Sequence, residues 1–356
     1  MFVPRVDVCC CTMRESLRRL ASDDGMERRA RSTGRRRRVR VELMCMEHIS
    51  VDIDRKARGA DLLDRICECL DLEERDYFGL LYTQRGDPRM WVDLNKKLSK
   101  TFRNEPWDVR FAVKFYPPEP ADLKDDATRN QVALAVRRDL MEGRLTCSQI
   151  TYALLSSYVL QAELGDFEEA QVLSTALHEH RAAPVSVITP ELEANIDELY
   201  RKHKGQTPAE AELNYLETAK RLALYGAELH PAADSRDVPL TLAVGHSGVA
   251  VYRDGILLNR FPWAKITKIC YNKREFSLRL RAAECEPQPT ALAFRLPAAR
   301  ACRKLWVGCV EHHMFYRRSS PVPVALVPGW AGLGARRLSC RRTLRQLRDE
   351  APPSAA

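Results

Sequence analysis

Long apolar runs are missing from this sequence. Nowhere in its 356 residues does an uninterrupted hydrophobic stretch approach the ~20 residues that a membrane-spanning helix requires. The N-terminus also lacks the apolar stretch and small-residue cleavage site of a secretory leader, which argues against secretion. Twelve cysteines are present, but they are scattered, and Cys67 and Cys69 form a CxC without a matching pair. We therefore expect reduced cytosolic thiols, several of them packed in cores.

Catalytic motifs are missing as well. The sequence contains no GxxxxGK[ST] phosphate loop, no HExxH zinc motif, no HC-x5-R phosphatase loop and no HRD or DFG kinase motif. The segment Gly245-His246-Ser247-Gly248 lacks the spacing of a nucleophile elbow. His178 and His180 offer two imidazoles, but such lone pairs beside loop residues are more often solvent-exposed than metal-bound. We expect no enzyme activity, no cofactor and no metal site.

Basic charge is concentrated at the two ends of the chain. Residues 1–40 carry twelve arginines and five acidic residues, and residues 317–356 carry eight arginines and two acidic residues. Since the whole chain has a formal charge of +9, the residues between these ends carry −4. A nucleic-acid-binding domain should place its basic residues along a folded face, so we expect no nucleic-acid partner.

Neither end shows a periodic apolar pattern. Residues 28–38 hold seven arginines, and like charges with little to bury favour disorder over residues 1–38. Such a run could bind an anionic membrane leaflet, direct nuclear import or be a solvated tail. Residues 318–356 are rich in Pro, Gly, Ser and Arg, so we expect a second disordered basic tail there.

Regular structure is predicted from Val39 onward. Apolar and polar residues alternate in two adjacent segments, with Val39, Val41 and Leu43 in the first and Ile49, Val51 and Ile53 in the second. This alternation predicts a hairpin with one buried face. A helix from Asp61 to Leu70 and short strands near 77–82, 91–92 and 109–115 follow. This order is ubiquitin-like, and we assign it to residues 39–117.

Prolines at 117, 118 and 120 interrupt the chain, and the apolar period then becomes helical. We expect helices over 126–142 and 148–164, a third from Thr189-Pro190 and a fourth from Thr207 to Gly226. The fourth begins with capping signals at Thr207, Pro208 and Glu210, and Gly226 can stop it in the left-handed conformation. Residues 118–231 thus predict a small bundle like an acyl-CoA-binding protein. A likeness of fold alone does not imply an acyl-CoA ligand.

The apolar period returns to two after Pro231. Asp254-Gly255 marks a hairpin turn, and Phe261-Pro262-Trp263 is expected to begin the next strand. Further strands are expected over 275–281 and 291–295, and Pro297 opens a helix that reaches Phe315. A bent antiparallel sheet closed by one C-terminal helix predicts a PH/PTB-like lobe over residues 232–317.

Several stretches resemble one family. Residues around the fourth predicted helix stand at the spacing of the second FERM-domain signature, namely Tyr200, Glu210, Ala211, Tyr215, Leu216, Ala219, Leu222, Tyr225, Gly226, Glu228 and Leu229. The segments LLSSYVLQAELGDF, FPWAKITKICY and WVGCVEHHMFYR also resemble FERM domains, and they resemble those of band 4.1 proteins more than those of the ezrin group. Thr101 departs from the first FERM signature, which usually has Gln or His there. The resemblance covers roughly residues 39–317 and implies an α+β multidomain protein, a three-lobed FERM cloverleaf with disordered basic tails.

This resemblance implies a non-enzymatic adaptor at the plasma membrane and cell cortex. Such a protein would link cytoplasmic tails of transmembrane proteins, and anionic inner-leaflet lipids such as phosphoinositides, to the cortical cytoskeleton. Actin and spectrin proteins would be indirect partners. Two alternatives stay open. One is the FERM targeting module of a truncated signalling protein such as a FERM-containing tyrosine phosphatase, and the other is a basic nuclear protein that uses the arginine run.

The PTB-like lobe implies a peptide-binding groove, because PTB ligands add a strand to a sheet edge beside the C-terminal helix. We place that edge at residues 275–281. The predicted groove residues are Phe276, Ser277, Leu278, Arg279, Leu280, Arg281, Leu305, Cys309 and His312. Phe276, Leu278 and Leu280 should point into the core. Arg279, Arg281 and Arg303 could select acidic tails or only keep the edge soluble, and His312 is expected to cap helix carbonyls rather than sense pH.

Two smaller sites are also predicted. Lys96 and Lys97 follow Trp91 where FERM domains carry lipid-binding lysines, although Asp93 stands where ezrin-type proteins have lysine. The resemblance thus implies a phosphoinositide site, with a solvated charge pair as the alternative. Ser339 follows two arginines at the spacing that basophilic kinases prefer, which makes it a phosphorylation candidate.

Overall fold

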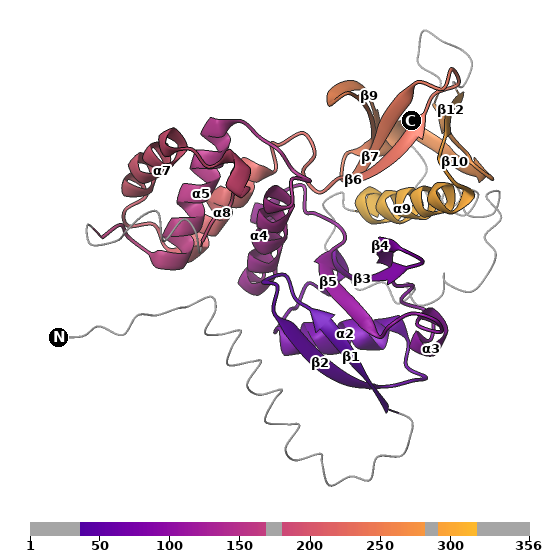
Figure 1. Ribbon diagram of the computed structural model, residues 1–356, viewed down its shortest axis with the longest axis horizontal. Helices are drawn as coiled ribbons and strands as arrows, with labels where there is room; N and C mark the ends of the chain where they lie inside the picture. Colours follow the sequence, from indigo (N-terminus) through magenta and orange to yellow (C-terminus); the bar gives the residue numbers. More distant parts are fainter. Residues whose placement is uncertain (1–35, 169–179, 282–290, 319–356) are drawn as a thin grey trace, which may run out of the picture. The chain divides into compact units, whose positions relative to one another are not determined.

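The computed structural model describes residues 36–168, 180–281 and 291–318 (Figure 1). The chain divides into two compact units between Tyr225 and Gly226. Each unit has its own cluster of buried apolar side chains. The two predicted tails lie almost entirely outside the described residues.

The first unit begins with a five-stranded sheet of order β2-β1-β5-β3-β4. Its strands are β1 (Arg36–Glu42), β2 (His48–Asp54), β3 (Phe78–Gln84), β4 (Asp87–Trp91) and β5 (Asp108–Val113). Its helices are α2 (Gly59–Cys69), the short α3 (Leu98–Thr101) and the 3-10 turn η2 (Arg75–Tyr77). β1 and β5 run parallel, and the other neighbours are antiparallel. Val39 and Val41 on β1 and Leu62 on α2 are fully buried, so the predicted alternation and ubiquitin-like order are confirmed.

β1 begins at Arg36, three residues earlier than predicted. Arg36, Arg37 and Arg38 therefore pair with β2 instead of belonging to a tail. Arg38 forms a salt bridge with Asp52 across the strands at 3.2 Å. The Arg37 guanidinium lies 5.8 Å from the centre of the Trp107 ring. These cross-strand partners give the last arginines of the run a place in the sheet, which a count of charges does not reveal.

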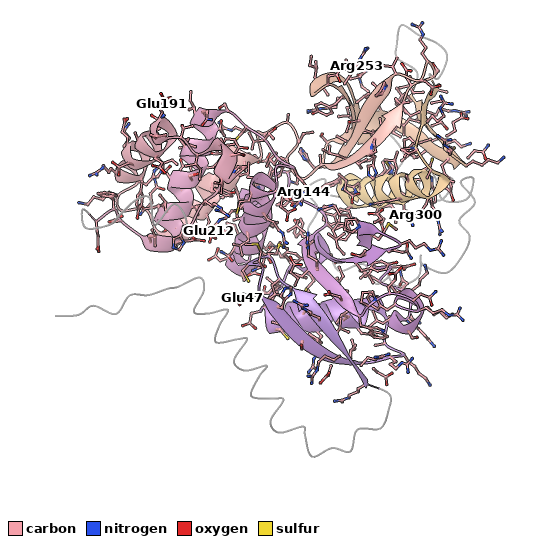
Figure 2. The ribbon with its side chains drawn as sticks, viewed as in Figure 1. Glu47, Arg144, Glu191, Glu212, Arg253 and Arg300 are labelled. Atoms are coloured by element: carbon pink, nitrogen blue, oxygen red, sulfur yellow. The ribbon has the colours of Figure 1, made fainter. Side chains whose placement is uncertain are left out.

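The second half of the first unit is a helical bundle. Its elements are η3 (Pro120–Asp122), α4 (Asp126–Met141), α5 (Gln149–Leu164), η4 (Val185–Val187), α7 (Pro190–Lys202) and α8 (Pro208–Ala219) (Figures 1 and 2). The predicted capping box of α8 is present, because the Thr207 hydroxyl accepts from the Glu210 N–H while the Glu210 carboxylate accepts from the Thr207 N–H. The predicted end of this helix is wrong. α8 stops at Ala219, and turns continue to Gly226, whose φ is +60°.

The second unit is a seven-stranded antiparallel sheet of order β10-β11-β12-β6-β7-β8-β9, with one helix packed on it. The strands are β6 (Glu228–Ala233), β7 (Pro239–Gly245), β8 (Gly248–Arg253), β9 (Ile256–Pro262), β10 (Ile266–Asn272), β11 (Glu275–Leu280) and β12 (Ala291–Arg295). The helix is α9 (Ala299–Arg318), and it contacts β7, β8, β10 and β11. The predicted PH/PTB-like architecture of a bent sheet and a C-terminal helix is thus present.

Two element boundaries in this unit differ from the prediction. β6 begins at Glu228, before the predicted lobe boundary at 231. Phe261 and Pro262 end β9 rather than beginning a new strand, and Trp263 opens the 3-10 turn η5 (Trp263–Lys265) that leads to β10. The Trp263 indole N–H donates to the Gly245 carbonyl at 3.1 Å, which holds the chain in this turn.

Candidate functional site

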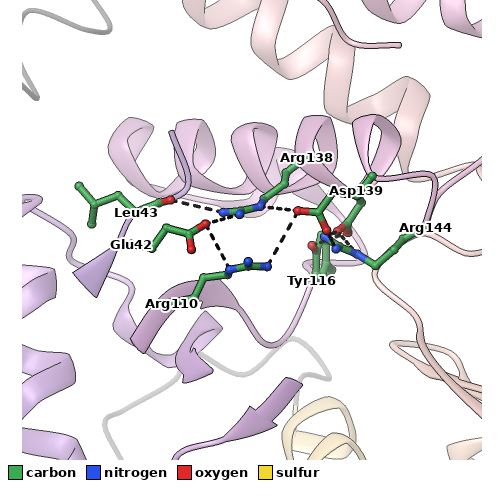
Figure 3. Close-up of polar contacts among 8 residues, drawn as sticks. Glu42, Leu43, Arg110, Tyr116, Arg138, Asp139 and Arg144 are labelled. Carbon is green, nitrogen blue, oxygen red and sulfur yellow. Dashed lines mark hydrogen bonds and ion pairs between the residues drawn. The ribbon is translucent and has the colours of Figure 1, made fainter. Parts of the chain in front are cut away.

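A cluster of charged side chains joins the sheet of the first unit to its helical bundle (Figure 3). Glu42 at the end of β1 accepts from Arg138 on α4 and lies 3.3 Å from Nε of Arg110 on β5. Arg138 also donates to Glu142, just beyond α4, at 2.7 Å. Burial by itself would raise the pKa of Glu42. The hydrogen bonds and charges of Arg138 and Arg110 outweigh it, so the pKa of this carboxyl lies below its usual value.

A second set of contacts ties the two ends of the bundle together. The Tyr116 hydroxyl donates to Asp139 at 2.7 Å, and Arg144 pairs with the same carboxylate. The Tyr225 hydroxyl donates to the Pro117 carbonyl at 3.1 Å, and its ring lies edge-on to Tyr116 with centroids 5.4 Å apart. One cluster of buried side chains runs through the sheet and the bundle. These contacts make the first two lobes one packed body.

The predicted peptide-binding edge is wrong. β11 lies inside the sheet, because it pairs with β10 on one side and with β12 on the other. Its backbone N–H and C=O groups are therefore engaged in two ladders, and no peptide strand can be added beside it. The alternation of Phe276 and Leu278, both fully buried, was predicted well. Such alternation is the same in a central strand and in an edge strand that covers a core, so it could not show which strand is the edge.

The other predicted groove residues fall into two groups. Leu305 and Cys309 on α9 are fully buried in the core, and burial raises the pKa of the Cys309 thiol well above its usual value. His312 is buried too, with Nδ1 2.8 Å from the Gly308 carbonyl oxygen, which agrees with the expected carbonyl contact. By contrast Arg279, Arg281 and Arg303 are exposed, and Ser277 and Leu280 are half-buried. None of these residues forms an open sheet edge.

The edge strand beside the helix is β10. It ends the sheet on this side, and α9 packs against it. The Trp306 indole N–H on α9 donates to the Ile269 carbonyl at 3.2 Å, and its ring centre lies 5.2 Å from that of Tyr271. Tyr271 is 39% exposed and Val307 on α9 is 37% exposed. The outer edge of β10 and this apolar helix face together form a candidate groove, which we call the β10–α9 groove.

β10 lies within the strand expected from Phe261 to Tyr271, but its apolar pattern is irregular for a physical reason. A β-bulge shifts its pairing with β11 between Ile266 and Lys268, so the buried residues Ile266 and Ile269 are three apart instead of two. The period-two signal is lost at that point. The segment FPWAKITKICY, which contains the start of β10, indicates a strand here through its family resemblance rather than through its period.

The remaining predicted sites are distributed over the chain. Lys96 Nζ lies 3.5 Å from Asp93 Oδ2, which is the charge pair weighed as an alternative, and Lys97 is exposed just before α3. His180 pairs with Glu163. His178 and Ser339 lie outside the described residues. Among the residues that are described, no three His, Cys, Asp or Glu side chains are placed to hold a metal ion. Within the same ranges, no helix is long and apolar enough to cross a bilayer.

Comparison with known proteins agrees with this architecture. Three family models match in order: the FERM N-terminal domain over residues 41–104, the FERM central domain over 118–230 and the FERM C-terminal PH-like domain over 234–324. Among solved structures, the FERM and C-terminal domain complex of Drosophila Merlin aligns with a TM-score of 0.70 at 24% identity. That alignment covers 79% of this chain and 96% of the Merlin chain. The chain therefore belongs to the FERM family.

Within that family the similar curated proteins are band 4.1 proteins. The protein 4.1 homolog of Drosophila melanogaster is 48% identical over 295 residues, which cover 83% of this chain and 17% of that protein. Human protein 4.1 is 43% identical over 268 residues, which cover 75% of this chain and 31% of that protein. The chain thus has a FERM domain of the band 4.1 type, and it spans less than a third of either relative.

Proposed function

We propose that this protein is a non-enzymatic adaptor that holds the cytoplasmic tail of a transmembrane protein near the inner leaflet. In this role it links the tail to the cortical cytoskeleton at the plasma membrane, with actin and spectrin proteins as indirect partners. The observation that carries the proposal is the β10–α9 groove, a sheet edge beside an apolar helix face in a band 4.1-type FERM domain. Its similarity to band 4.1 proteins favours the adaptor over a tyrosine phosphatase fragment.

The groove suits an extended peptide because of how β10 faces. Antiparallel strands alternate residues whose N–H and C=O face the neighbour with residues whose groups face away. The Ile269 carbonyl contacts Trp306, so Ile269 faces away from β11, and Tyr271, two residues on, faces the same way. An added strand would pair with the outward N–H and C=O of Tyr271, while the Trp306 and Tyr271 rings and Val307 would select apolar side chains. Nearby Arg303 is exposed and favours acidic residues in the tail.

Replacing Tyr271 with proline tests this groove. Tyr271→Pro removes one outward N–H, and proline is tolerated on an edge strand when its missing N–H faces away from the sheet. Tyr271→Ala is the matched control, because it removes the same ring and keeps the N–H. Titration of a receptor-tail peptide should give weaker binding for the proline variant than for the alanine variant, by about fivefold for one lost hydrogen bond. Circular dichroism should show that both variants are folded.

Equal affinity of these two folded variants would mean that no strand is added at β10, and the tail would then bind another lobe. Proline at Ser277 or Arg279 would not serve this test. Both residues lie in the central strand β11, where proline removes a ladder hydrogen bond or distorts the sheet.

We further propose that Lys96 and Lys97 contribute a phosphoinositide contact on the first lobe. Lys97 is exposed, whereas Lys96 shares its charge with Asp93. Basic residues near an anionic leaflet contribute about 1 kcal/mol each, so we expect weak, salt-sensitive binding. Lys96→Glu/Lys97→Glu should reduce co-sedimentation with phosphoinositide vesicles. Unchanged co-sedimentation would remove both lysines from the membrane contact.

Ser339 remains a proposed phosphorylation site. A phosphate there would offset the neighbouring Arg336 and Arg337 charges and weaken any attraction of this segment to an anionic leaflet. Phosphopeptide mapping from cells checks the proposal, and finding only the unmodified peptide under kinase-activating conditions would rule it out.

A further inference from the structure

The β8–β9 hairpin exposes three consecutive aliphatic residues. Ile256, Leu257 and Leu258 are 68%, 44% and 55% exposed. They follow the two-residue turn Asp254-Gly255, in which φ is +49° and +78°, as a tight hairpin requires. Single exposed apolar residues are ordinary, but a contiguous apolar patch on a soluble domain marks an interaction surface.

Both faces of this hairpin end are uncovered. Successive residues of a strand point to opposite faces of the sheet, yet Ile256 and Leu257 are both exposed. β9 is the outermost strand at the edge opposite β10, so among the described strands β8 is its single neighbour. A protein partner with a flat surface would cover one face and leave the other in water. A fluid apolar medium would surround both faces.

The strand geometry disfavours pairing with a second copy of the chain. The register between β8 and β9 shifts between Val251 and Tyr252, which leaves Leu258 as the extra residue of a bulge. Bulges on edge strands break the straight ladder that edge-to-edge association needs, and natural sheets use them to prevent it. The aliphatic residues are therefore displayed at an edge that is poorly suited to β-pairing.

The charges on either side of the aliphatic residues match an anionic lipid surface. Arg253 precedes the turn and Arg260 follows the aliphatic residues, and both are exposed. Figure 2 shows Arg253 at this end of the sheet. Asp254 is the one acidic residue between them, and its carboxylate lies 3.8 Å from Arg253. Aliphatic side chains that enter the acyl boundary, with arginines at headgroup level, are the combination that interfacial segments use.

We propose that the β8–β9 hairpin is a membrane-insertion site, which places Ile256, Leu257 and Leu258 in the acyl boundary of an anionic bilayer. It deepens the proposed role at the inner leaflet, on which it rests. It differs from the Lys96 and Lys97 contact in lobe and in chemistry. Because the aliphatic contribution is not electrostatic, salt should weaken the lysine contact and spare the hairpin contact.

The test compares two variants on vesicles of phosphatidylcholine and phosphatidylserine, in low and high salt. Ile256→Ser/Leu257→Ser/Leu258→Ser removes the aliphatic tip. Ile150→Ser, at a residue that is 79% exposed on α5, is the matched control. We expect the triple variant to partition onto the vesicles at least about tenfold less than wild type, because each aliphatic side chain that leaves water stabilises the bound state. The difference should persist in high salt, and the control should bind like wild type.

A second variant measures how deeply the hairpin enters the bilayer. Leu257→Trp should show a blue-shifted emission with vesicles, and lipids brominated along their acyl chains should quench it. Equal partition of the triple variant and wild type, or a tryptophan that brominated lipids do not quench, would overturn the proposal. A wild-type dimer that the triple variant loses, with vesicle binding unchanged, would assign the tip to a second copy and overturn it too. Binding that only Lys96→Glu/Lys97→Glu abolishes would end the hairpin proposal and leave the adaptor function standing.

Discussion

Glu212 on α8 is a half-buried carboxyl in the helical bundle with an unusual environment. It lines a small cavity together with residues of α4 and α5. Asn130 Nδ2 on α4 donates to it at 2.5 Å. Tyr215, one helical turn away, has a buried hydroxyl with no hydrogen-bond partner among the residues that the structure describes. Burial is the largest effect on Glu212 and raises its pKa to about 7, with Glu163 and Asp126 adding repulsion and Asn130 and Arg129 opposing it.

This raised pKa makes stability depend on pH. Below the usual carboxyl pKa of 4.5 both the folded and the unfolded state hold the proton. Above it the unfolded state loses the proton first, so the free energy of unfolding falls as pH rises toward 7. Glu212→Gln should abolish this fall and stabilise the protein at pH ~8 by about 1–3 kcal/mol. Urea unfolding of both proteins at several pH values measures the difference.

Glu191→Gln is the matched control for this prediction. Glu191 is an exposed carboxyl in the first turn of α7, in the same bundle (Figure 2). Its substitution should leave the pH profile of wild type in place. If Glu212→Gln and wild type keep the same slope between pH ~5 and ~8, the Glu212 carboxyl is ionised in the folded protein and the assignment is wrong.

The two ends of α8 differ in how well the sequence predicts them. The capping box at Thr207 and Glu210 predicted the start of α8, because capping involves only residues within one turn. Its end was mispredicted, since Leu222 and Tyr225 continue the apolar pattern although the chain has left the helix. They pack on the core from turns instead. An apolar pattern indicates which residues are buried, and residues in turns can be buried as well as residues in a helix.

Strand order depends on contacts that no local pattern records. The sequence predicted the buried face of β11 correctly and its position in the sheet wrongly. The neighbours of β11 are β10 and β12, and β12 begins only at Ala291, well after β11 ends at Leu280. For the same reason the Glu42–Arg138 contact could not be predicted, since its residues are 96 positions apart. Such pairs are set by how elements far apart in the sequence pack against each other.

A substitution can test how much the contact between β1 and α4 contributes to stability. Arg138→Met keeps an unbranched apolar stem and removes the charge that holds Glu42 and Glu142. Glu42 would then keep Arg110 as its cationic partner, while Glu142 would keep both Arg110 and Arg144. We expect the free energy of unfolding to fall by about 1–3 kcal/mol, because a largely buried carboxylate loses its main partner. Chemical denaturation of the two proteins measures the loss.

Lys202→Met provides the comparison. Lys202 pairs with Glu198 on α7, and both side chains are more than 60% exposed. An exposed pair contributes about 0–0.5 kcal/mol, so this substitution should be nearly neutral. Adding Glu42→Gln to Arg138→Met should recover part of the loss, because it removes the stranded charge. Equal effects of Arg138→Met and Lys202→Met would show that the junction contributes no more than a surface pair.

For the whole molecule, the division into two units has a thermodynamic consequence. The apolar cluster of the first unit spans two of the three FERM lobes, whereas that of the second unit belongs to the PH-like lobe, and the two clusters share no residue. Chains with separate cores need not unfold in one step. We therefore expect calorimetry of the full chain to resolve two transitions, one for each unit.

Two core substitutions assign these transitions. Leu160 on α5 and Leu278 on β11 are both fully buried, the first in the core of the first unit and the second in that of the second. Replacing either with alanine should cost about 2–5 kcal/mol, the usual loss for truncating a buried leucine. Leu160→Ala should lower only the transition of the first unit and Leu278→Ala only that of the second. If each substitution instead moves a single common transition, the units unfold together, and the groove and hairpin of the second unit then depend on the stability of the first.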